Sequence, residues 1–348
     1  MIKKFLITED KTIKKAMQLI HKNSRRCLIV ISSSKKMLGT LSDGDIRNAL
    51  LTNSTLSNKI SNFYNKKAKF LFKNTYTKDQ LKQLFKKNHY DLIPILNKDK
   101  TVSDVAFWNK ELKSKTKYKK FDVPVVIMAG GEGTRLQPFT KVLPKPLIPI
   151  KDKPVIEHIM EKFVYFGFSK FTFTINYKAE IIKAYFNELK SNLKINFVEE
   201  FLPLGTAGAI KFLEKKIKKD FFVVNCDTIV DINYRDLYSF HKKNKNDITI
   251  IASAKEYKIP YGICNINSKG LLLSIKEKPK FNFLASSGMY VLNPSIFKLI
   301  PKKGKFHFSN LIAEAKKNNF KVGVYPIDDN LWLDVGQWSE YKKVINSL

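Results

Sequence analysis

The residues with the clearest chemical potential form a glycine-rich turn, Gly130–Gly133, in the middle of the chain. Three of its four residues are glycine, and it directly follows the apolar run Val123–Ala129, which is typical of a strand buried on both faces of a parallel sheet. Glycine lets the backbone approach a ligand closely, and backbone N–H groups turned inward bind anions. Arg135 and Lys145 add two cations. The segment therefore predicts a binding site for a phosphate chain.

This turn is neither of two common nucleotide-binding loops. The third glycine of the dinucleotide-binding pattern G-x-G-x-x-G is replaced by Leu136. The spacing of a Walker loop is also absent. The turn by itself thus predicts phosphate binding without specifying a family.

A second candidate side chain follows another predicted strand. Phe221–Val224 is a short apolar run, and it ends at Asn225-Cys226-Asp227. A side chain at the carboxyl end of a parallel strand stands in the crevice where such sheets bind ligands. Asp227 is therefore expected to face the ligand.

The first third of the chain contains an internal repeat of helix, strand, turn and strand. In the first copy an amphipathic stretch opens at Thr12 and a strand is predicted at Cys27–Ile31. In the second copy the stretch opens at Thr77 and the strand is predicted at Leu92–Leu96. This repetition predicts a small α+β module built from two related halves.

A polar, lysine-rich segment, residues 111–120, follows the repeat and has no apolar periodicity, so it is predicted to be a linker. The length of 348 residues also favours two domains. We therefore expect a small N-terminal domain over residues 1–118 and a larger α/β domain over residues 121–348.

The formal charge of +32 suggests a nucleic-acid partner, but the composition argues against it. Only five of the 63 basic residues are arginine, whereas nucleic-acid readers depend on arginine for bidentate contacts. A solvated lysine surface is favoured, and no nucleic-acid partner is expected.

The cysteines and the apolar runs indicate the compartment. Cys27, Cys226 and Cys264 are scattered, so neither a disulfide framework nor a zinc site is predicted. No apolar run approaches the roughly 20 residues of a membrane span, and no secretory segment follows Met1. A cytoplasmic protein without a membrane partner is expected.

The N-terminal repeat resembles a pair of CBS motifs, on the strength of the segment Gly39–Ile46, GTLSDGDI. In ligand-binding members, Gly-x-x-Ser/Thr-x-x-Asp holds phosphate and ribose, which implies an adenine-nucleotide site at Ser42 and Asp45. The same two residues also have the spacing of an ordinary helix-capping pair. The second copy offers only Thr101–Asp104, without the glycine. Nucleotide sensing and a structural role both stay open, and a homo-oligomer is expected because CBS pairs commonly stack.

The segment 129–159, AGGEGTRLQPFTKVLPKPLIPIKDKPVIEHI, resembles the signature of sugar-1-phosphate nucleotidyltransferases, and the resemblance continues to the end of the chain. It implies a Rossmann-like mixed sheet and a reaction that joins an NTP to a sugar 1-phosphate with release of pyrophosphate. The resemblance implies catalytic roles for Arg135, Lys145 and Asp227. It implies nucleotide binding by Ala129, Gly130, Gly131, Gly133, Thr134, Glu200, Gly205, Thr206 and Ala207.

The base-binding block of that family resembles Glu200–Ala209, with Glu200 where members place the side chain that reads the base edge. A carboxylate accepts two hydrogen bonds, and guanine offers two adjacent donors, whereas uracil and thymine suit glutamine better. GTP is therefore the preferred nucleotide. The alternative is that Glu200 is a solvated loop carboxylate.

The resemblance also implies a metal and a sugar site. Asp227 and Asp334 match the family's two Mg²⁺ ligands, and two carboxylates with phosphate oxygens make the hard oxygen site that Mg²⁺ prefers. The sugar-phosphate site is implied at Tyr261, Gly262, Glu277, Lys278 and Gly288.

Within the family, the chain is most similar to guanylyltransferases that activate sugars for bacterial surface glycans. These include the glucosamine-1-phosphate enzymes of legionaminic acid synthesis and the heptose-1-phosphate enzymes. A thymidylyl-, uridylyl- or cytidylyltransferase is the alternative. A nucleotide-sensing protein with an inactive transferase domain is a further one, against which the intact Arg135, Lys145 and Asp227 argue.

Overall fold

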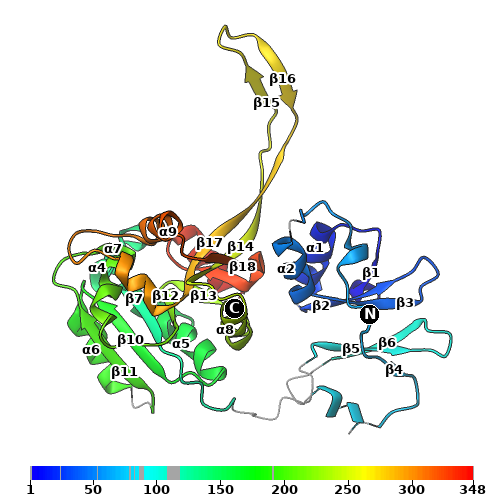
Figure 1. The fold of residues 1–348 in the computed structure, drawn as a ribbon, viewed down its shortest axis with the longest axis horizontal. Helices are drawn as coiled ribbons and strands as arrows, with labels where there is room; N and C mark the ends of the chain where they lie inside the picture. Colours follow the sequence, from blue (N-terminus) through cyan, green and yellow to red (C-terminus); the bar gives the residue numbers. More distant parts are fainter. Residues whose placement is uncertain are drawn as a thin grey trace. The chain divides into compact units, whose positions relative to one another are not determined.

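A computed structural model describes residues 2–23, 25–52, 54–77, 80–81, 83–85, 90–107, 118–189 and 192–347. The chain divides into two compact units (Figure 1). The first contains the described residues of Met1–Thr116, with Lys255–Phe283 and Pro326–Asp328, and the second contains the remainder. Most of the predicted linker, residues 111–117, lies outside the described residues.

Two three-stranded sheets of the same pattern form the repeat in the first unit. In each, the middle strand pairs parallel with the strand before it and antiparallel with the strand after it. The sheets are β1 (Leu6–Thr8), β2 (Cys27–Ile31) and β3 (Met37–Ser42), and β4 (Leu71–Phe72), β5 (Leu92–Leu96) and β6 (Val102–Phe107). The strands predicted at 27–31 and 92–96 are confirmed at the same bounds.

Equivalent residues of the two repeats contact each other. The backbone N–H of Arg26, just before β2, donates to the carboxylate of Asp91, just before β5, at 2.7 Å. Lys36, just before β3, forms a β-bridge with Thr101, just before β6. Contacts between equivalent positions are what a local two-fold axis produces. The internal repeat predicted from the sequence is therefore a pseudo-symmetric pair.

Short helices complete this unit, namely η1 (Ile2–Phe5), α1 (Ile13–Asn23), α2 (Asp43–Leu51) and η2 (Ile60–Asn62). Ser42 is the N-cap of α2, and its hydroxyl accepts the N–H of Asp45 at 3.2 Å. The carboxylate of Asp45 accepts the N–H and the hydroxyl of Ser42 at 2.7 and 2.6 Å. The capping pair allowed by the sequence is therefore present, and it engages both polar side chains of the CBS-like motif.

A seven-stranded sheet forms the centre of the second unit, with the order β11-β10-β7-β12-β17-β14-β18 (Figure 1). The first four strands are parallel, and β17 is antiparallel to β12. In that order the strands are Lys194–Glu199, Lys170–Ile175, Val125–Ala129, Phe221–Asn225, Lys280–Leu292, Ile248–Lys258 and Val322–Asp328. The predicted mixed sheet is confirmed.

Helices cover both faces of this sheet because alternate strand residues point to opposite sides. Phe222 of β12 packs against Phe163 of α5, with ring centroids 5.5 Å apart. Its neighbour Phe221 stacks on Phe297 of η6 on the other face, also at 5.5 Å. The longer helices are α5 (Val155–Tyr165), α6 (Ala179–Glu188), α8 (Tyr234–Lys243), α9 (Phe308–Lys317) and α10 (Trp338–Ser347).

Shorter elements make the remaining connections of this unit. They are η3 (Thr134–Leu136), α4 (Phe139–Val142), η4 (Lys145–Leu147), β8 (Pro149–Ile150), β9 (Lys153–Pro154), α7 (Gly205–Gly208), η5 (Ala209–Leu213), β13 (Thr228–Val230), η6 (Pro294–Leu299), η7 (Asp329–Leu331) and β19 (Trp332–Asp334). Along the described stretches, no helix combines the length and apolarity needed to span a bilayer.

Candidate active site

The carboxyl ends of three adjacent parallel strands bring the candidate residues to one edge of the sheet. β7 ends at Ala129 and leads into Gly130, β10 leads into Asn176, and β12 leads into Asp227. Because neighbouring parallel strands end at the same edge, the side chains that follow them converge there.

Asp227 and Asp334 meet through a short antiparallel pair. Thr228 in β13 lies opposite Asp334 in β19. The carboxylate of Asp334 accepts the N–H of Gly336 at 2.7 Å. A Cβ atom at Gly336 would lie 2.6 Å from Asp227 Oδ2 and 2.9 Å from Asp334 Oδ1. Both carboxylates therefore face the same small space, although more than a hundred residues separate them in the chain.

Lys145 forms an ion pair with Asp227 at this place. The two side chains are only 13% and 12% exposed, so water screens the pair weakly. Burial, the largest single effect, lowers the pKa of Lys145, but the charge of Asp227, the neighbouring Cys226 thiol and the hydrogen bond to Asp227 together hold the pKa above its ordinary value. Lys145 is therefore a fixed cation beside the carboxylates.

The electrostatics of Asp334 link it to the same group of charges. Burial raises the pKa of Asp334, and the nearby charge of Asp227 adds to the shift. The Gly336 N–H and the cations Lys145 and Arg135 act in the opposite direction. The two carboxylates repel each other, so a cation that binds between them is stabilised.

The donor set at this place fits a magnesium ion that arrives with a phosphate-bearing ligand. Among the residues that the structure describes, no three or more His, Cys, Asp or Glu side chains gather as a closed metal cage. Mg²⁺ is commonly held by one or two carboxylates together with substrate phosphates and water. Asp227 and Asp334 supply that number of carboxylates.

The glycine turn lies beside Lys145. Gly133 has a φ of +67°, in the left-handed region that favours glycine. A Cβ there would lie 2.8 Å from Thr140 Cγ2 and 3.1 Å from the Cβ of Lys145. Gly131 differs, because a Cβ at that position would meet no atom within 4 Å. One glycine is thus required by the fold, and the other leaves open space next to the site.

This difference gives a prediction for two alanine substitutions. Gly133→Ala is expected to lower the free energy of unfolding by about 1–3 kcal/mol through backbone strain and overlap. Gly131→Ala is expected to leave stability within about 0.5 kcal/mol but to raise the KM for the nucleotide roughly tenfold or more, because its methyl group enters the ligand's space. Thermal melting and steady-state kinetics measure both. An unchanged KM in Gly131→Ala would contradict a phosphate chain lying against this residue.

Glu200 is buried against the glycine turn. A Cβ on Gly130 would lie 2.8 Å from Glu200 Oε1, so the glycine makes room for this carboxylate. Burial raises the pKa of Glu200, while the Leu204 N–H, which donates to Oε2 at 3.2 Å, acts in the opposite direction. Glu200 is only 6% exposed, so the alternative of a solvated loop carboxylate is wrong.

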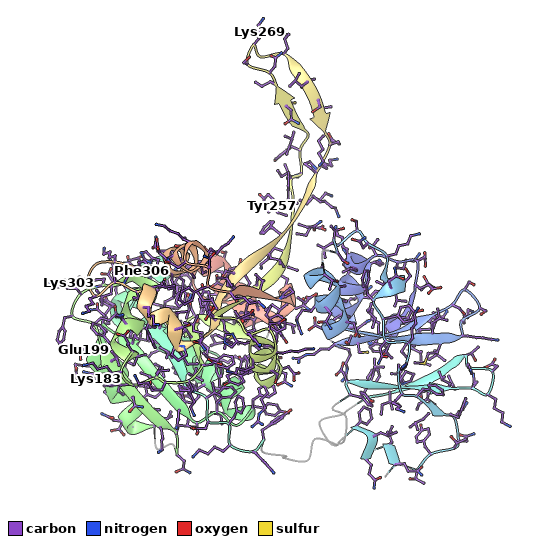
Figure 2. All side chains as sticks on the ribbon, viewed as in Figure 1. Lys183, Glu199, Tyr257, Lys269, Lys303 and Phe306 are labelled. Atoms are coloured by element: carbon purple, nitrogen blue, oxygen red, sulfur yellow. The ribbon has the colours of Figure 1, made fainter. Side chains whose placement is uncertain are left out.

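Hydrogen bonds to the loop before α9 hold the segment Gly205–Gly208 in place. The N–H groups of Ala207 and Gly208 both donate to the carbonyl of Phe306 at 3.0 Å, and Phe306 is marked in Figure 2. The hydroxyl of Thr206 accepts the N–H of Phe308 at 3.1 Å. Gly205 has a φ of +78°, which makes glycine the suitable residue at this turn.

The residues implied for the sugar phosphate fall in two places. In the first unit, β15 (Ile263–Ile266) and β16 (Leu272–Lys276) form an antiparallel hairpin. Tyr261 and Gly262 precede β15, Glu277 and Lys278 follow β16, and Glu277 Oε2 would lie 3.0 Å from a Cβ on Gly262. The side chains of Tyr261, Glu277 and Lys278 are exposed. Gly288 lies in the second unit.

Gly288 contacts the site through Asn225. Its φ is +79°, and a Cβ there would lie 3.0 Å from Asn225 Cγ and 3.3 Å from Thr228 Oγ1. The glycine therefore makes room for the Asn225 side chain, which directly precedes the Cys226-Asp227 segment.

Three residues that the sequence did not assign also shape the site. The side-chain amide of Asn176 donates to the carbonyl of Glu200. The ammonium of Lys178 donates to the carbonyls of Lys141 and Val142 at 2.6 and 2.8 Å. The indole N–H of Trp338 donates to the carbonyl of Gln137 at 2.8 Å. For Asn176 and Lys178, the one signal in the sequence was their position just after a buried strand, which the structure places next to β7.

Sequence models of known families match both parts of the chain. The model described as nucleotidyl transferase matches residues 124–348, and the model described as CBS domain matches residues 1–52. The second match covers the first repeat.

Two curated relatives illustrate the similarity. The chain is 34% identical over 218 residues to the D-glycero-alpha-D-manno-heptose 1-phosphate guanylyltransferase of Campylobacter jejuni, which covers 62% of this chain and 96% of that protein. It is 36% identical over 232 residues to the mannose-1-phosphate guanyltransferase of Yarrowia lipolytica, covering 62% of this chain. The chain spans 61% of the length of that relative.

Solved structures show the same fold. HddC from Yersinia pseudotuberculosis is 29% identical with a TM-score of 0.51, covering 64% of this chain and 98% of that one. The inositol-1-phosphate CTP transferase from T. maritima, at 15% identity and a TM-score of 0.50, covers 65% and 96% and shares the fold. Since the family match runs from the strand before the glycine turn to the C-terminal helix, the chain belongs to the nucleotidyl transferase family.

Proposed function

We propose that the protein is a sugar-1-phosphate guanylyltransferase, which joins GTP to a sugar 1-phosphate and releases pyrophosphate. The observation that carries this proposal is the convergence of Asp227, Asp334 and Lys145 on one space beside the glycine turn. The named activities of the heptose-1-phosphate and mannose-1-phosphate relatives support it.

The reaction is an in-line displacement at the α-phosphorus of the nucleotide. An oxygen of the sugar phosphate forms the new P–O bond, the bond to the β-phosphate breaks, and pyrophosphate leaves with its electron pair. The nucleophile is already an anion, so no general base is required. Catalysis then depends on aligning two polyanions and neutralising the charge that grows during transfer.

Three basic side chains bind different phosphate groups in the proposed reaction. The exposed Arg135 side chain in η3 binds the departing pyrophosphate, and Lys145, whose side chain is 13% exposed, holds the phosphates near the reacting centre. Because Lys145 is fixed by Asp227, little reorganisation is needed at the moment of transfer. Lys278 is proposed to hold the attacking sugar phosphate, with Glu277 accepting from sugar hydroxyls.

Asp227 and Asp334 would hold a Mg²⁺ ion, which supplies charge neutralisation for the phosphates when bound. Their own contribution is to keep two carboxylates oriented toward one point, with the Gly336 N–H fixing the orientation of Asp334. Asn225 and the short β13–β19 pair position them.

Glu200 is proposed to select guanine. A buried carboxylate whose pKa is raised by burial gains from additional donors, and guanine presents N1–H and N2–H₂ side by side. The sugar is proposed to be a heptose, mannose or glucosamine 1-phosphate for a bacterial surface glycan, legionaminic acid synthesis included. The protein is proposed to act in the cytoplasm.

A pyrophosphate-release screen of the four NTPs against a panel of these sugar phosphates tests the proposal. GTP is expected to react fastest, and Glu200→Gln is expected to lower kcat/KM for GTP by about 10–100-fold, since charge-assisted hydrogen bonds contribute roughly 1.5–3 kcal/mol. Glu199→Gln is the matched control, because Glu199 pairs with Lys183 at 2.7 Å outside the site (Figure 2). Preference of the unmodified protein for UTP or TTP would contradict the assignment.

We propose that the N-terminal repeat has a structural role, as the first of two candidate roles. The Ser42 and Asp45 side chains are bonded to each other in the α2 cap, so a nucleotide would have to compete with that bond. Adenine-nucleotide sensing is the second candidate, supported by the CBS match over residues 1–52. A change of activity or melting temperature on adding AMP or ATP would favour sensing.

A further inference from the structure

The chain that follows Asp334 contacts the loop that carries the phosphate-binding cations. Trp338 opens α10 four residues after Asp334, and its indole N–H donates to the carbonyl of Gln137 at 2.8 Å. Gln137 lies two residues after Arg135. One short stretch of chain therefore bears a carboxylate of the proposed metal site at one end and holds the Arg135 turn at the other.

A second contact lies one helical turn further along α10. The hydroxyl of Tyr341 donates to the carbonyl of Pro149 at 2.7 Å, and Pro149 lies four residues after Lys145. The rings of Trp338 and Tyr341 also pack on Phe139, with centroids 4.9 and 6.2 Å from its ring. Helix α10 therefore fixes the loop on both sides of Lys145.

The loop between these contacts has little regular structure of its own. Residues 134–150 form only η3, α4, η4 and β8, none longer than four residues. Such short elements leave backbone carbonyls without a partner inside the element. Donors from outside take that part, because the Tyr177 hydroxyl donates to the carbonyl of Thr140 at 3.2 Å and Lys178 donates to two further carbonyls. Among these bonds, the one from Trp338 lies nearest to Arg135 along the chain.

The charge of Arg135 depends on this loop for its position. Arg135 lies in a three-residue turn, and its side chain is exposed. Burial has the largest effect on the pKa of both Lys145 and Asp334, and the charge of Arg135 contributes by lowering both. The guanidinium is thus close enough to act on the candidate active site, and a shift of its turn would change that distance.

We propose that Trp338, with Tyr341, is a positioning residue, which keeps the Arg135 turn in place relative to Asp334 for the binding of pyrophosphate. The inference rests on the proposed function for the identity of this ligand. A shift of the turn away from the carboxylates would have to break the bond between Trp338 and Gln137. Misplacing a binding group by about 1 Å can lower a rate about 100-fold, so a single bond at this place can matter for activity.

Trp338→Phe tests the proposal, because phenylalanine keeps an aromatic ring beside Phe139 and removes the indole N–H. The dissociation constant for pyrophosphate with Mg²⁺, measured by isothermal titration calorimetry, is expected to rise about tenfold, and kcat to fall by a similar factor. The KM for the sugar phosphate is expected to stay within about twofold, because Glu277 and Lys278 lie in the other unit. A general loss of structure would instead change both ligands' constants and the melting temperature together.

A double-mutant cycle asks whether Trp338 acts through Arg135. Arg135→Ala is expected to weaken pyrophosphate binding at least as much as Trp338→Phe. Adding Trp338→Phe to it is expected to change the dissociation constant by less than about twofold, because the group that Trp338 positions is already gone. Additive effects in the double variant would contradict a role through Arg135.

Tyr185→Phe is the matched control, since it removes a hydroxyl that donates to Glu157 between α6 and α5. Its pyrophosphate dissociation constant is expected to stay within about twofold of the unmodified value. If Trp338→Phe fails to fold in circular dichroism, Tyr341→Phe removes the other bond from α10 and keeps the ring. That variant is expected to raise the dissociation constant at least about threefold, and an unchanged value would contradict the proposal.

The calorimetric measurement does not depend on which base or sugar the enzyme uses. If GTP is not the preferred nucleotide but Trp338→Phe still weakens pyrophosphate binding, the guanylyl assignment fails and the positioning role stands. A dissociation constant in folded Trp338→Phe within about twofold of the unmodified protein overturns the positioning role, whatever the nucleotide screen gives.

Discussion

Asp227→Asn is expected to reduce the rate of pyrophosphate release at least about 1,000-fold at saturating GTP and sugar phosphate. The substitution removes the charge that lies beside both Lys145 and Asp334 and would hold Mg²⁺ against the phosphates. Losing one preorganised electrostatic contact typically costs 100- to 1,000-fold, and loss of metal binding adds to that. The fold is expected to persist, because the backbone carbonyl of residue 227 still accepts the Val335 N–H at 2.9 Å.

Asp231→Asn is the matched control, because Asp231 is a nearby exposed carboxylate paired with Lys162 at 3.2 Å. Its activity is expected to stay within about twofold, since exposed pairs contribute little. The two variants are compared by kinetics and by thermal melting. Full activity in Asp227→Asn, with melting behaviour like the unmodified protein, would remove Asp227 from the proposed metal site.

Gly336→Ala is expected to lower kcat by about 100-fold without unfolding the protein. The added methyl carbon would lie 2.6 Å from Asp227 Oδ2 and 2.9 Å from Asp334 Oδ1, closer than carbon atoms normally approach oxygen. The backbone of Gly336 is outside the left-handed region, so alanine is acceptable there and the carboxylates have to separate. Overpacking of this kind costs about 1–3 kcal/mol of stability.

The Mg²⁺ dependence of the rate distinguishes this effect from general damage. Gly336→Ala is expected to need several-fold more Mg²⁺ for half-maximal activity, whereas Gly44→Ala, where the nearest atom to the new carbon is 3.5 Å away, leaves the requirement unchanged. If both variants show the same Mg²⁺ requirement as the unmodified protein, the two carboxylates do not share an ion.

Local features of the fold were predictable because short-range forces determine them. The strands at Cys27–Ile31 and Leu92–Leu96 are continuous apolar runs, and both are observed at the predicted bounds. The capping pair of Ser42 and Asp45 depends only on a spacing of three residues, so the sequence predicted it too. The position of Asp227 just after β12 was also predictable, because the apolar run Phe221–Val224 indicates a buried strand that ends there.

The glycine turn shows what prediction from local sequence cannot reach. From the sequence, its three glycines look alike, but an alanine at 133 would overlap Thr140 whereas one at 131 would enter open space. Glu200 was open between a base-reading group and a solvated carboxylate until its burial against Gly130 excluded the second. Neither distinction is local, because each depends on atoms that come from a distant segment of the chain.

The sequence by itself determined the strands, the caps, the repeat and the kinds of residue available for binding phosphate, since periodicity and hydrogen bonds between near neighbours suffice for these. Only the tertiary structure decided that Asp334 meets Asp227 around Gly336 and that Asn176 and Trp338 hold the loops of the site. These features arise from pairing between segments far apart in sequence. Their energies are sums of many distant contacts, which no short window of residues contains.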